Sequence, residues 1–334
     1  MSVIRDVAQT REIYSEAGER GWVLPCFCSE NLTTTEAVLS AAEDFRTQHG
    51  LKTLPVILGI TCLYDHRSQA VNYTHTRRWD TGLKLFTNDV KTLCEDGGPF
   101  EKLSVMIHLD HIQHDLDHVL LKSDLRDYAS ILYDASTLPL EENIRKTADF
   151  VSRRGKDILV EGACDEIVDA SGESHNALTT PEQALRYWRE TGVDLVVCNL
   201  GTEHRASGKD LQYYGETSRD IKKLIGSRIV LHGTSSVPNE QVSTLYSDGV
   251  CKVNIWTALE RDSSPALFAG MVRNARKIAD AKTVGVLVAE GLLTEKANRE
   301  QKMDLKYFTT LYRQSVVFDK MKDIVRGYLD MWYT

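Results

Sequence analysis

Ser104-Val-Met-Ile-His-Leu-Asp-His111 is an apolar, β-rich run that ends abruptly in two polar residues. We predict a strand that carries the carboxylate of Asp110 and the imidazole of His111 to its C-terminal end. A carboxylate beside an imidazole on a rigid strand end suits a metal site with acid/base chemistry. Taken alone, the stretch is also compatible with a histidine satisfied in the core and a helix N-cap, because single short motifs often match by chance.

Similar apolar runs recur along the chain and alternate with segments of helical spacing. The eight runs cover residues 22–28, 55–61, 104–111, 130–136, 157–162, 194–201, 228–232 and 250–256. They are continuously apolar, as expected for parallel strands that are buried on both faces. The pattern predicts a parallel sheet closed into a (β/α)8 TIM barrel, a fold whose chemistry lies at the C-terminal ends of the strands.

The segment after the barrel is wholly helical in pattern. Residues 265–280 are expected to form one helix and residues 304–332 another, rich in Tyr, Phe and Met. We therefore divide the chain into a barrel, residues 1–262, and a C-terminal helical extension, residues 263–334. One interpretation of the extension is a cap on the barrel. Its aromatic and Met content favours a subunit interface instead, and hence a homodimer or homotetramer.

The composition argues against several classes of partner. The net charge is −8 and no run of Lys or Arg occurs, so nucleic acid is not expected. The N-terminus lacks the apolar core of a signal peptide, and no long uncharged apolar stretch predicts a membrane span. Most of the seven cysteines lie in or beside apolar runs, and Cys26 and Cys28 have the wrong spacing for a CxxC pair. These features indicate a reduced, cytoplasmic protein.

Three histidines are expected at the ends of different strands. His111 ends one run, His204 follows the run at residues 194–201, and His232 ends the run at residues 228–232. Three neutral imidazoles that leave a fourth position open form a catalytic zinc arrangement. Only a closed barrel brings these positions together, and structural histidines are the alternative.

Three further histidines fit other roles better. His114 and His118 share a helical face at i and i+4, but Asp115 and Asp117 beside them favour a solvated face. His108 alternates to the same side of the strand as Asp110 and is expected to point into the barrel.

Two loops at the end of the predicted barrel have the composition of a phosphate site. Gly233-Thr-Ser-Ser236 leads into a helix, and Asn254-Ile-Trp-Thr257 precedes another. Loops after the seventh and eighth strands, together with helix N-termini, commonly bind phosphate in such barrels. A plain Ser/Thr N-cap is the alternative.

Several segments together resemble one known family, the class II ketose-bisphosphate aldolases of the fructose- and tagatose-bisphosphate types. The resemblance spans roughly residues 20–262. Its carriers are His108-Leu-Asp-His111, Tyr133-Asp-Ala-Ser-Thr-Leu-Pro-Leu-Glu-Glu-Asn-Ile144, Val160-Glu-Gly162, Thr191-Gly-Val-Asp194, Gly201-Thr-Glu-His204, Leu231-His-Gly-Thr-Ser235 and Lys252-Val-Asn-Ile-Trp-Thr257.

The resemblance implies a metal centre and an acid/base residue. One catalytic Zn²⁺ per chain would be held by His111, His204 and His232, and a monovalent cation is a further cofactor to consider. Asp110 would move the proton of the hydroxyl whose carbon–carbon bond breaks or forms. The metal would polarise a carbonyl and stabilise the enediolate in a reversible reaction.

The resemblance also implies positions for the substrate and for further acids. The donor and its phosphate would be held by Gly233, Ser235, Asn254 and Thr257. Asp134 and Glu161 match acidic positions near the metal.

Departures from the family pattern fall within the predicted site. Ala163 stands at a second acidic position, and the Gly-Gly pair of a mobile, acid-bearing loop is missing. Glu166, Asp169 and Glu173 are possible substitutes for the mobile acid, and we select Glu173 because it is nearest to a loop tip.

Other departures alter the predicted donor pocket. Arg205 replaces a glycine, and its guanidinium fork can bind phosphate or carboxylate. The first strand ends in Cys28 where Asn is usual, although Asn31 fits that role. Gly-Gly-Ser becomes Gly233-Thr-Ser235, and Asn-Xaa-Asp-Thr becomes Asn254-Ile-Trp-Thr257.

The sequence therefore predicts a metal-dependent aldolase with a non-standard substrate. That substrate would be a sugar phosphate or a related anionic ketose or aldehyde. Two alternatives stay open: another metal-dependent isomerase or lyase that acts on a keto acid on the same barrel, and a non-catalytic aldolase-like subunit.

Overall fold

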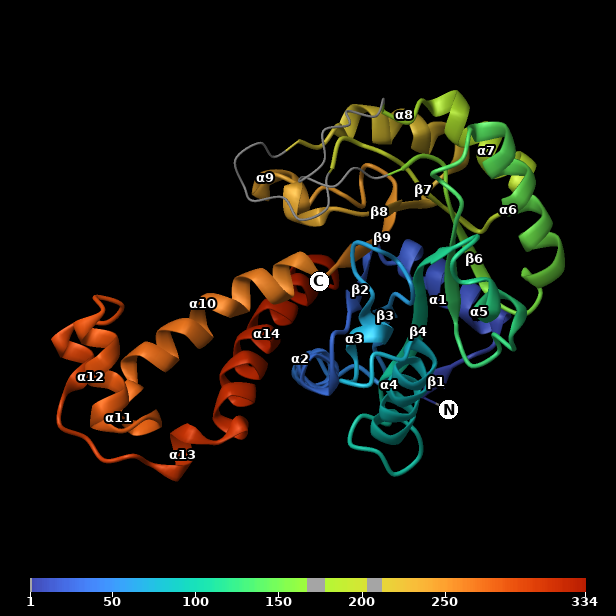
Figure 1. Ribbon diagram of the computed structural model, residues 1–334. Helices are drawn as coiled ribbons and strands as arrows, with labels where there is room; N and C mark the ends of the chain where they lie inside the picture. Colours follow the sequence, from blue (N-terminus) through green and yellow to red (C-terminus); the bar gives the residue numbers. More distant parts are fainter. Residues whose placement is uncertain (1, 167–177, 203–211) are drawn as a thin grey trace.

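The computed structural model describes residues 2–166, 178–202 and 212–334, and it forms a closed barrel with a helical arm (Figure 1). Parallel strands pair in the order β4-β3-β2-β9-β8-β7-β6-β5, and a further pairing between β5 and β4 closes the ring. The predicted (β/α)8 barrel with a C-terminal helical extension is confirmed. The eight barrel strands are β2 (Leu24–Cys28), β3 (Pro55–Ile60), β4 (Ser104–Gln113), β5 (Ser130–Asp134), β6 (Leu159–Ala163), β7 (Leu195–Val197), β8 (Ile229–Leu231) and β9 (Val250–Ile255).

A short additional strand, β1 (Val3–Ile4), was not predicted. It pairs in parallel with the first half of β4, where Val3 lies opposite Val105. The second half of β4 pairs with β5, beginning where His108 lies opposite Ser130. A strand of two residues offers no periodicity, so the sequence pattern could not reveal it.

Helices connect the strands and cover the outside of the barrel (Figure 1). The helix α7 shows how the sequence sets the start and the end of a helix. Thr180 and Gln183 form a reciprocal capping box, Pro181 occupies the first turn, and Gly192 ends the helix with φ of 73°. The helices before the arm are α1 (Val7–Glu19), α2 (Leu32–Gln48), α3 (Gln69–Asn72), α4 (Trp79–Cys94), α5 (His118–Lys122), α6 (Leu140–Arg154), α7 (Pro181–Thr191), α8 (Gly215–Ile225) and α9 (Asn239–Val242).

The helical face expected for His114 and His118 is wrong. The strand β4 continues to Gln113, His114 lies in a turn, and only α5 is helical in this stretch. The cause is Asp117, which is buried and accepts hydrogen bonds from the backbone N–H groups of Leu63 and Gln113. Burial raises the pKa of Asp117 to about 6. The turn is therefore fixed by a buried carboxylate and not by a solvated acidic face.

The C-terminal arm consists of two long helices that run side by side away from the barrel, with three short helices at the far end (Figure 1). The long helices are α10 (Thr257–Arg273) and α14 (Thr310–Trp332); the short ones are α11 (Ala275–Ile278), α12 (Ala281–Ala289) and α13 (Leu305–Phe308).

The helix expected to start at residue 265 begins instead at Thr257 and contains Pro265 in its interior. The helix α10 thus crosses the division drawn between residues 262 and 263, and that division stays a prediction. At the other end of the arm, α14 packs against α2. The indole of Trp332 donates to the Val242 carbonyl at 3.0 Å. In the described ranges, no helix combines the length and the apolar character that a membrane span needs.

Candidate active site

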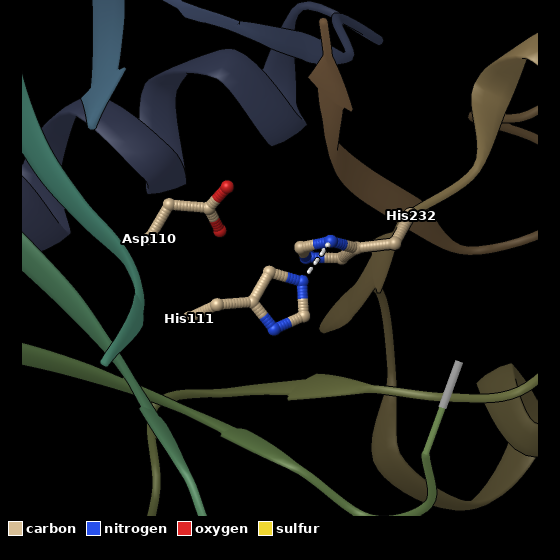
Figure 2. A group of neighbouring side chains, drawn as sticks. All are labelled: Asp110, His111 and His232. Carbon is tan, nitrogen blue, oxygen red and sulfur yellow. Dashed lines mark hydrogen bonds between the residues drawn. The ribbon is translucent and has the colours of Figure 1, made fainter. Parts of the chain in front are cut away.

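The end of β4 presents two consecutive side chains to the same place. Successive residues of a regular strand point to opposite faces. Here the pairing with β5 shifts register between Leu109 and Ile112, and His111 adopts a positive φ of 45°. Such a bulge re-aims a side chain. Asp110 and His111 can therefore both be buried next to His232, which follows β8 (Figure 2).

These three side chains form a group that could hold a metal ion. One ligand atom from each of Asp110, His111 and His232 lies within 4.8 Å of the others, and all three residues are buried. His111 Nε2 lies 3.1 Å from His232 Nδ1. Two nitrogens that share a tetrahedral zinc at ordinary bond lengths are about 3.3 Å apart. The observed geometry fits such a metal, while His204, the third predicted ligand, lies outside the described residues.

The ring of His111 is held on both sides. Its Nδ1 lies 2.7 Å from Asp134 Oδ2, and Tyr64 stacks on it with ring centroids 4.4 Å apart. Metal-binding histidines commonly donate their other ring nitrogen to a carboxylate in this way. Burial alone would raise the pKa of Asp134, but hydrogen bonds from His111 and Ser136 bring it well below its usual value. Asp134 is thus an anion that orients His111.

Asp110 is fully buried and accepts hydrogen bonds through both carboxylate oxygens. Asn254 Nδ2 donates to Oδ1 at 2.8 Å, and Arg67 Nη2 donates to Oδ2 at 2.7 Å. Burial favours the neutral acid. The neighbouring His111, a hydrogen bond from His108, and the charges of His232 and Arg67 outweigh it and hold the pKa of Asp110 well below its usual value. The residue is therefore available as a base.

A buried ion pair lies inside the barrel, close to these residues. Lys252 Nζ is 2.8 Å from Glu161 Oε2 and 3.1 Å from His108 Nε2, and all three side chains are fully buried. His108 also lies 2.8 Å from Ser130 Oγ. His108 points inward as expected, and Glu161 is bound to Lys252 in the barrel interior.

The predicted phosphate loops line a pocket with an empty volume of about 340 Å³, which also contains Arg67 and Trp256. Gly233 has φ of 67°, a conformation that side chains with a Cβ rarely adopt. Thr257 is the first residue of α10. In the part of the chain that the structure describes, Ser235 Oγ and Asn254 Oδ1 are buried without a hydrogen-bond partner. Buried polar atoms usually have one, so these atoms point to a ligand.

Some predicted site residues are not brought to this pocket. Asn31 is exposed and caps α2, where its side chain accepts from Thr34 N at 3.2 Å. Glu173 and Arg205 lie in the ranges that the structure leaves undescribed. Glu166, another candidate for the mobile acid, lines a second pocket that is open to solvent and has an empty volume of about 510 Å³, together with His111, Asp134 and Tyr64.

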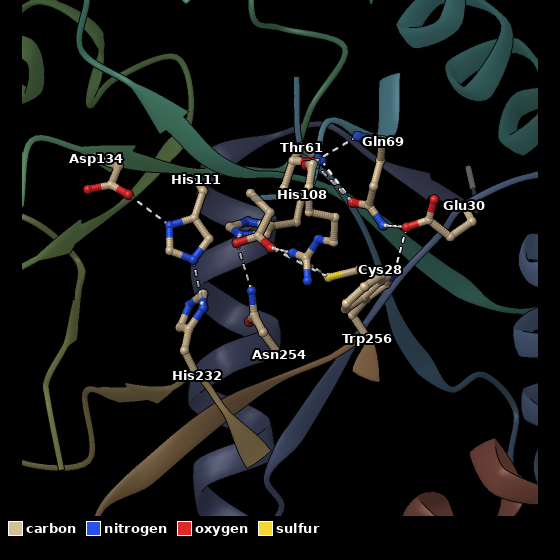
Figure 3. Close-up of polar contacts among 12 residues, drawn as sticks. Cys28, Glu30, Thr61, Gln69, His108, His111, Asp134, His232, Asn254 and Trp256 are labelled. Carbon is tan, nitrogen blue, oxygen red and sulfur yellow. Dashed lines mark hydrogen bonds and ion pairs between the residues drawn. The ribbon is translucent and has the colours of Figure 1, made fainter. Parts of the chain in front are cut away.

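Sequence reasoning missed the residues that follow β3. Arg67 lies over the ring of Trp256 at 5.1 Å, and the Trp256 indole donates to Glu30 at 2.5 Å. Gln69 Nε2 also donates to Glu30 at 3.0 Å (Figure 3). Their position after a strand end was the one available signal, because the segment contains no recognisable motif.

A closed parallel barrel with a buried Asp–His–His group at its strand ends has the architecture of a barrel enzyme, and the group could hold a metal ion. The family model described as fructose-bisphosphate aldolase class-II matches residues 8–325, and the chain belongs to this family. Its members are aldolases, which are carbon–carbon lyases, and the chain is an enzyme of this class.

Two solved structures share the fold. The fructose-bisphosphate aldolase from Campylobacter jejuni superposes with a TM-score of 0.77 at 17% identity, over 99% of this chain and 96% of that chain. The YdjI aldolase from Escherichia coli K12 gives a TM-score of 0.65 at 19% identity, over 96% and 95% of the two chains.

Proposed function

We propose that this enzyme is a zinc-dependent aldolase that reversibly cleaves a phosphorylated or otherwise anionic ketose other than the standard family substrate. The observation that supports it most is the buried Asp110 beside the facing nitrogens of His111 and His232. One Zn²⁺ per chain would be bound by these two histidines and His204. When bound, the ion would polarise the substrate carbonyl and stabilise the negative charge left when the carbon–carbon bond breaks.

Asp110 acts as the acid/base residue in this proposal. Its carboxylate takes the proton from the hydroxyl next to the breaking bond, and returns it in the direction of synthesis. Arg67 and Asn254 hold one oxygen each, so the carboxylate keeps a fixed orientation. Asp134 plays no part in proton transfer and orients the ring of His111.

The donor half of the substrate is assigned to the pocket beside His232. Gly233, Ser235, Asn254 and Thr257 line that pocket, where α10 begins. The N-terminus of this long helix favours an anion. We assign Arg205 to the same anion.

A mobile acid would complete the site. We keep Glu173 in that role and add Glu166 as its competitor, because Glu166 lines the cavity beside His111 and Asp134. Glu161 stays a structural acid near the metal, paired with Lys252. A monovalent cation stays a candidate cofactor without a located site.

The non-standard substrate follows from the side chains that form the donor pocket. Trp256 stands where the family pattern Asn-Xaa-Asp-Thr has an aspartate, and the guanidinium of Arg67 stacks on its ring. Trp256 and Arg67 alter the shape and the charge of the donor side, while Asp110 and the histidines are kept. Ala163, apolar where the family has a second acid, is buried in an apolar cluster and does not line this pocket.

Homodimers or homotetramers, formed through the arm, are part of the proposal. The arm exposes Phe268, Leu292, Leu305 and Leu311, each at least 68% accessible. Large apolar side chains gathered on a projecting element favour a subunit interface. A cytoplasmic location is supported by seven free, buried cysteines.

The test is a retro-aldol screen of phosphorylated and carboxylated ketoses, with fructose 1,6-bisphosphate included, on wild type and on His232→Ala. We expect cleavage of at least one anionic ketose at an enzymatic rate, its loss in the variant, and poor cleavage of fructose 1,6-bisphosphate. Turnover of fructose 1,6-bisphosphate at a normal enzymatic rate would refute the non-standard substrate. No cleavage of any ketose, with zinc bound, would refute the aldolase reaction itself.

A further inference from the structure

Arg67 lies in the loop between β3 and α3, and its side chain is 11% exposed. It lines the donor pocket together with Gly233, Ser235 and Thr257. Among the described residues that line this pocket, Arg67 is the one arginine or lysine. A buried cation in a pocket built from helix-start loops is a ready site for an anion.

The guanidinium is held in place from two sides. Nη2 donates to Asp110 Oδ2 at 2.7 Å, and the guanidinium carbon lies 5.1 Å from the centroid of the Trp256 ring. Trp256 is itself fixed by its hydrogen bond to Glu30 (Figure 3). An arginine stacked on an indole keeps its planar fork in one orientation.

Part of that fork has no protein partner. Arg67 Nε is buried without a hydrogen bond in the described part of the chain, as are Ser235 Oγ and Asn254 Oδ1. All three residues line the same pocket. An anionic oxygen of a ligand would accept from Arg67 Nε and from Ser235 Oγ, and a hydroxyl of the same ligand would donate to Asn254 Oδ1.

We infer that Arg67 is a specificity-determining residue that binds the anionic group of the donor substrate in this pocket and selects anionic over neutral donors. The inference rests on the proposed aldolase function and names the recognition element of its donor. Phosphate and carboxylate both match the chemistry, because each offers oxygen atoms to the guanidinium fork.

The first test measures binding without catalysis. Isothermal titration calorimetry of inorganic phosphate and of acetate is done on the full-length protein, as purified and after zinc removal with EDTA. The variants are Arg67→Gln and Arg67→Lys, and the matched control is Arg126→Gln, an exposed arginine paired with Asp124. We expect one of the two anions to bind wild type and Arg126→Gln equally and Arg67→Gln at least tenfold more weakly. Equal affinity in all proteins, or no binding to wild type, would overturn the inference.

The second test separates specificity from a merely structural role beside Asp110. Proton exchange of the donor with D₂O is followed by NMR for dihydroxyacetone phosphate, hydroxypyruvate and dihydroxyacetone, which carry a phosphate, a carboxylate and no charge. We expect Arg67→Gln to lower kcat/KM roughly a hundredfold or more for the preferred anionic donor, mainly through KM, and only a few-fold for dihydroxyacetone. For the anionic donor, kcat/KM of Arg67→Lys should lie between the values of wild type and Arg67→Gln.

The outcomes of this second test are distinct. The same loss for all three donors would mean that Arg67 supports the site as a whole and does not read the charge of the donor, and the inference would be wrong. Exchange of none of them by wild type would count against the aldolase proposal, while the calorimetry would still decide whether Arg67 binds an anion. Melting curves that match wild type in Arg67→Lys exclude a folding defect.

Discussion

The two sides of the candidate site differ in how completely their polar atoms are paired. On the side of β4 and β5, Asp134 holds His111 and the Asp110 oxygens both have donors. On the side of η1 (Thr234–Ser236) and the start of α10, buried atoms of Ser235 and Asn254 have no partner among the residues that the structure describes. The comparison indicates that the first side is preorganised for chemistry, and that the second is completed by the substrate.

The strongest way to break this comparison is to remove the acid/base group alone. Asp110→Asn keeps the shape and one acceptor, but it cannot take a proton. We expect kcat to fall by roughly 10²- to 10⁴-fold with the zinc content unchanged. Steady-state rates measured with metal analysis of the same samples check this. A variant that retains most of its kcat would move the acid/base role to another residue.

A smaller effect is expected from the residue that orients His111. Asp134→Asn removes the anion beside Nδ1, so zinc affinity should fall by about 10- to 100-fold. Competition against a chromophoric chelator measures this affinity. Asp115→Asn, an exposed acid on the neighbouring turn, is the control and should bind zinc like wild type. If both variants behave alike, Asp134 has no role at the metal.

On the substrate side, the role of the Trp256 indole that stacks with Arg67 can be tested in the same way. Trp256→Leu removes the stacking and the hydrogen bond to Glu30, and Trp256→Phe removes the hydrogen bond but keeps an aromatic face. A cation–π contact of this kind corresponds to roughly a 2- to 30-fold effect on binding. We expect KM for the anionic substrate to rise by that factor in the Leu variant and less in the Phe variant, with kcat nearly constant. A change confined to kcat would contradict the division of roles.

The smallest expected effect concerns stability. Burial, assisted by the charge of Glu30, raises the pKa of Glu260 to about 7, above its value in the unfolded chain. The folded state therefore binds more protons than the unfolded state between about pH 4.5 and pH 7, so stability falls as the pH rises through this window. In Glu260→Gln, the decrease in the free energy of unfolding over this pH range should be smaller than in wild type by about 1 to 2 kcal/mol. Urea unfolding of both proteins at pH 5 and pH 8 measures it, and parallel pH profiles would show that Glu260 is not responsible.

The fold was predictable because its signal is spread over the chain. Continuous apolar runs identified all eight barrel strands, and the rule of strand ends then placed His111 and His232 together. The two-residue β1 left no pattern. The bulge in β4 was also missed. So was the turn after it, because one of the two hydrogen bonds that Asp117 accepts there comes from Leu63, distant in sequence.

The substrate side was less predictable for a related reason. Arg67 meets Asp110 from 43 residues away, and no motif marks either the contact or the stacking on Trp256. Its placement depends on the path of one loop after β3. The roles predicted for Glu173, His204 and Arg205 depend on residues outside the described ranges and stay predictions.

The most direct test of the central claim is the zinc content of the purified protein. Elemental analysis should find about one zinc per chain in wild type and in His118→Ala, an exposed histidine outside the site. His232→Ala should lose the zinc while keeping a wild-type melting curve in the absence of metal. Zinc that persists in His232→Ala, or no zinc in any sample even after it is added back, would contradict the account of a zinc centre built on His111 and His232.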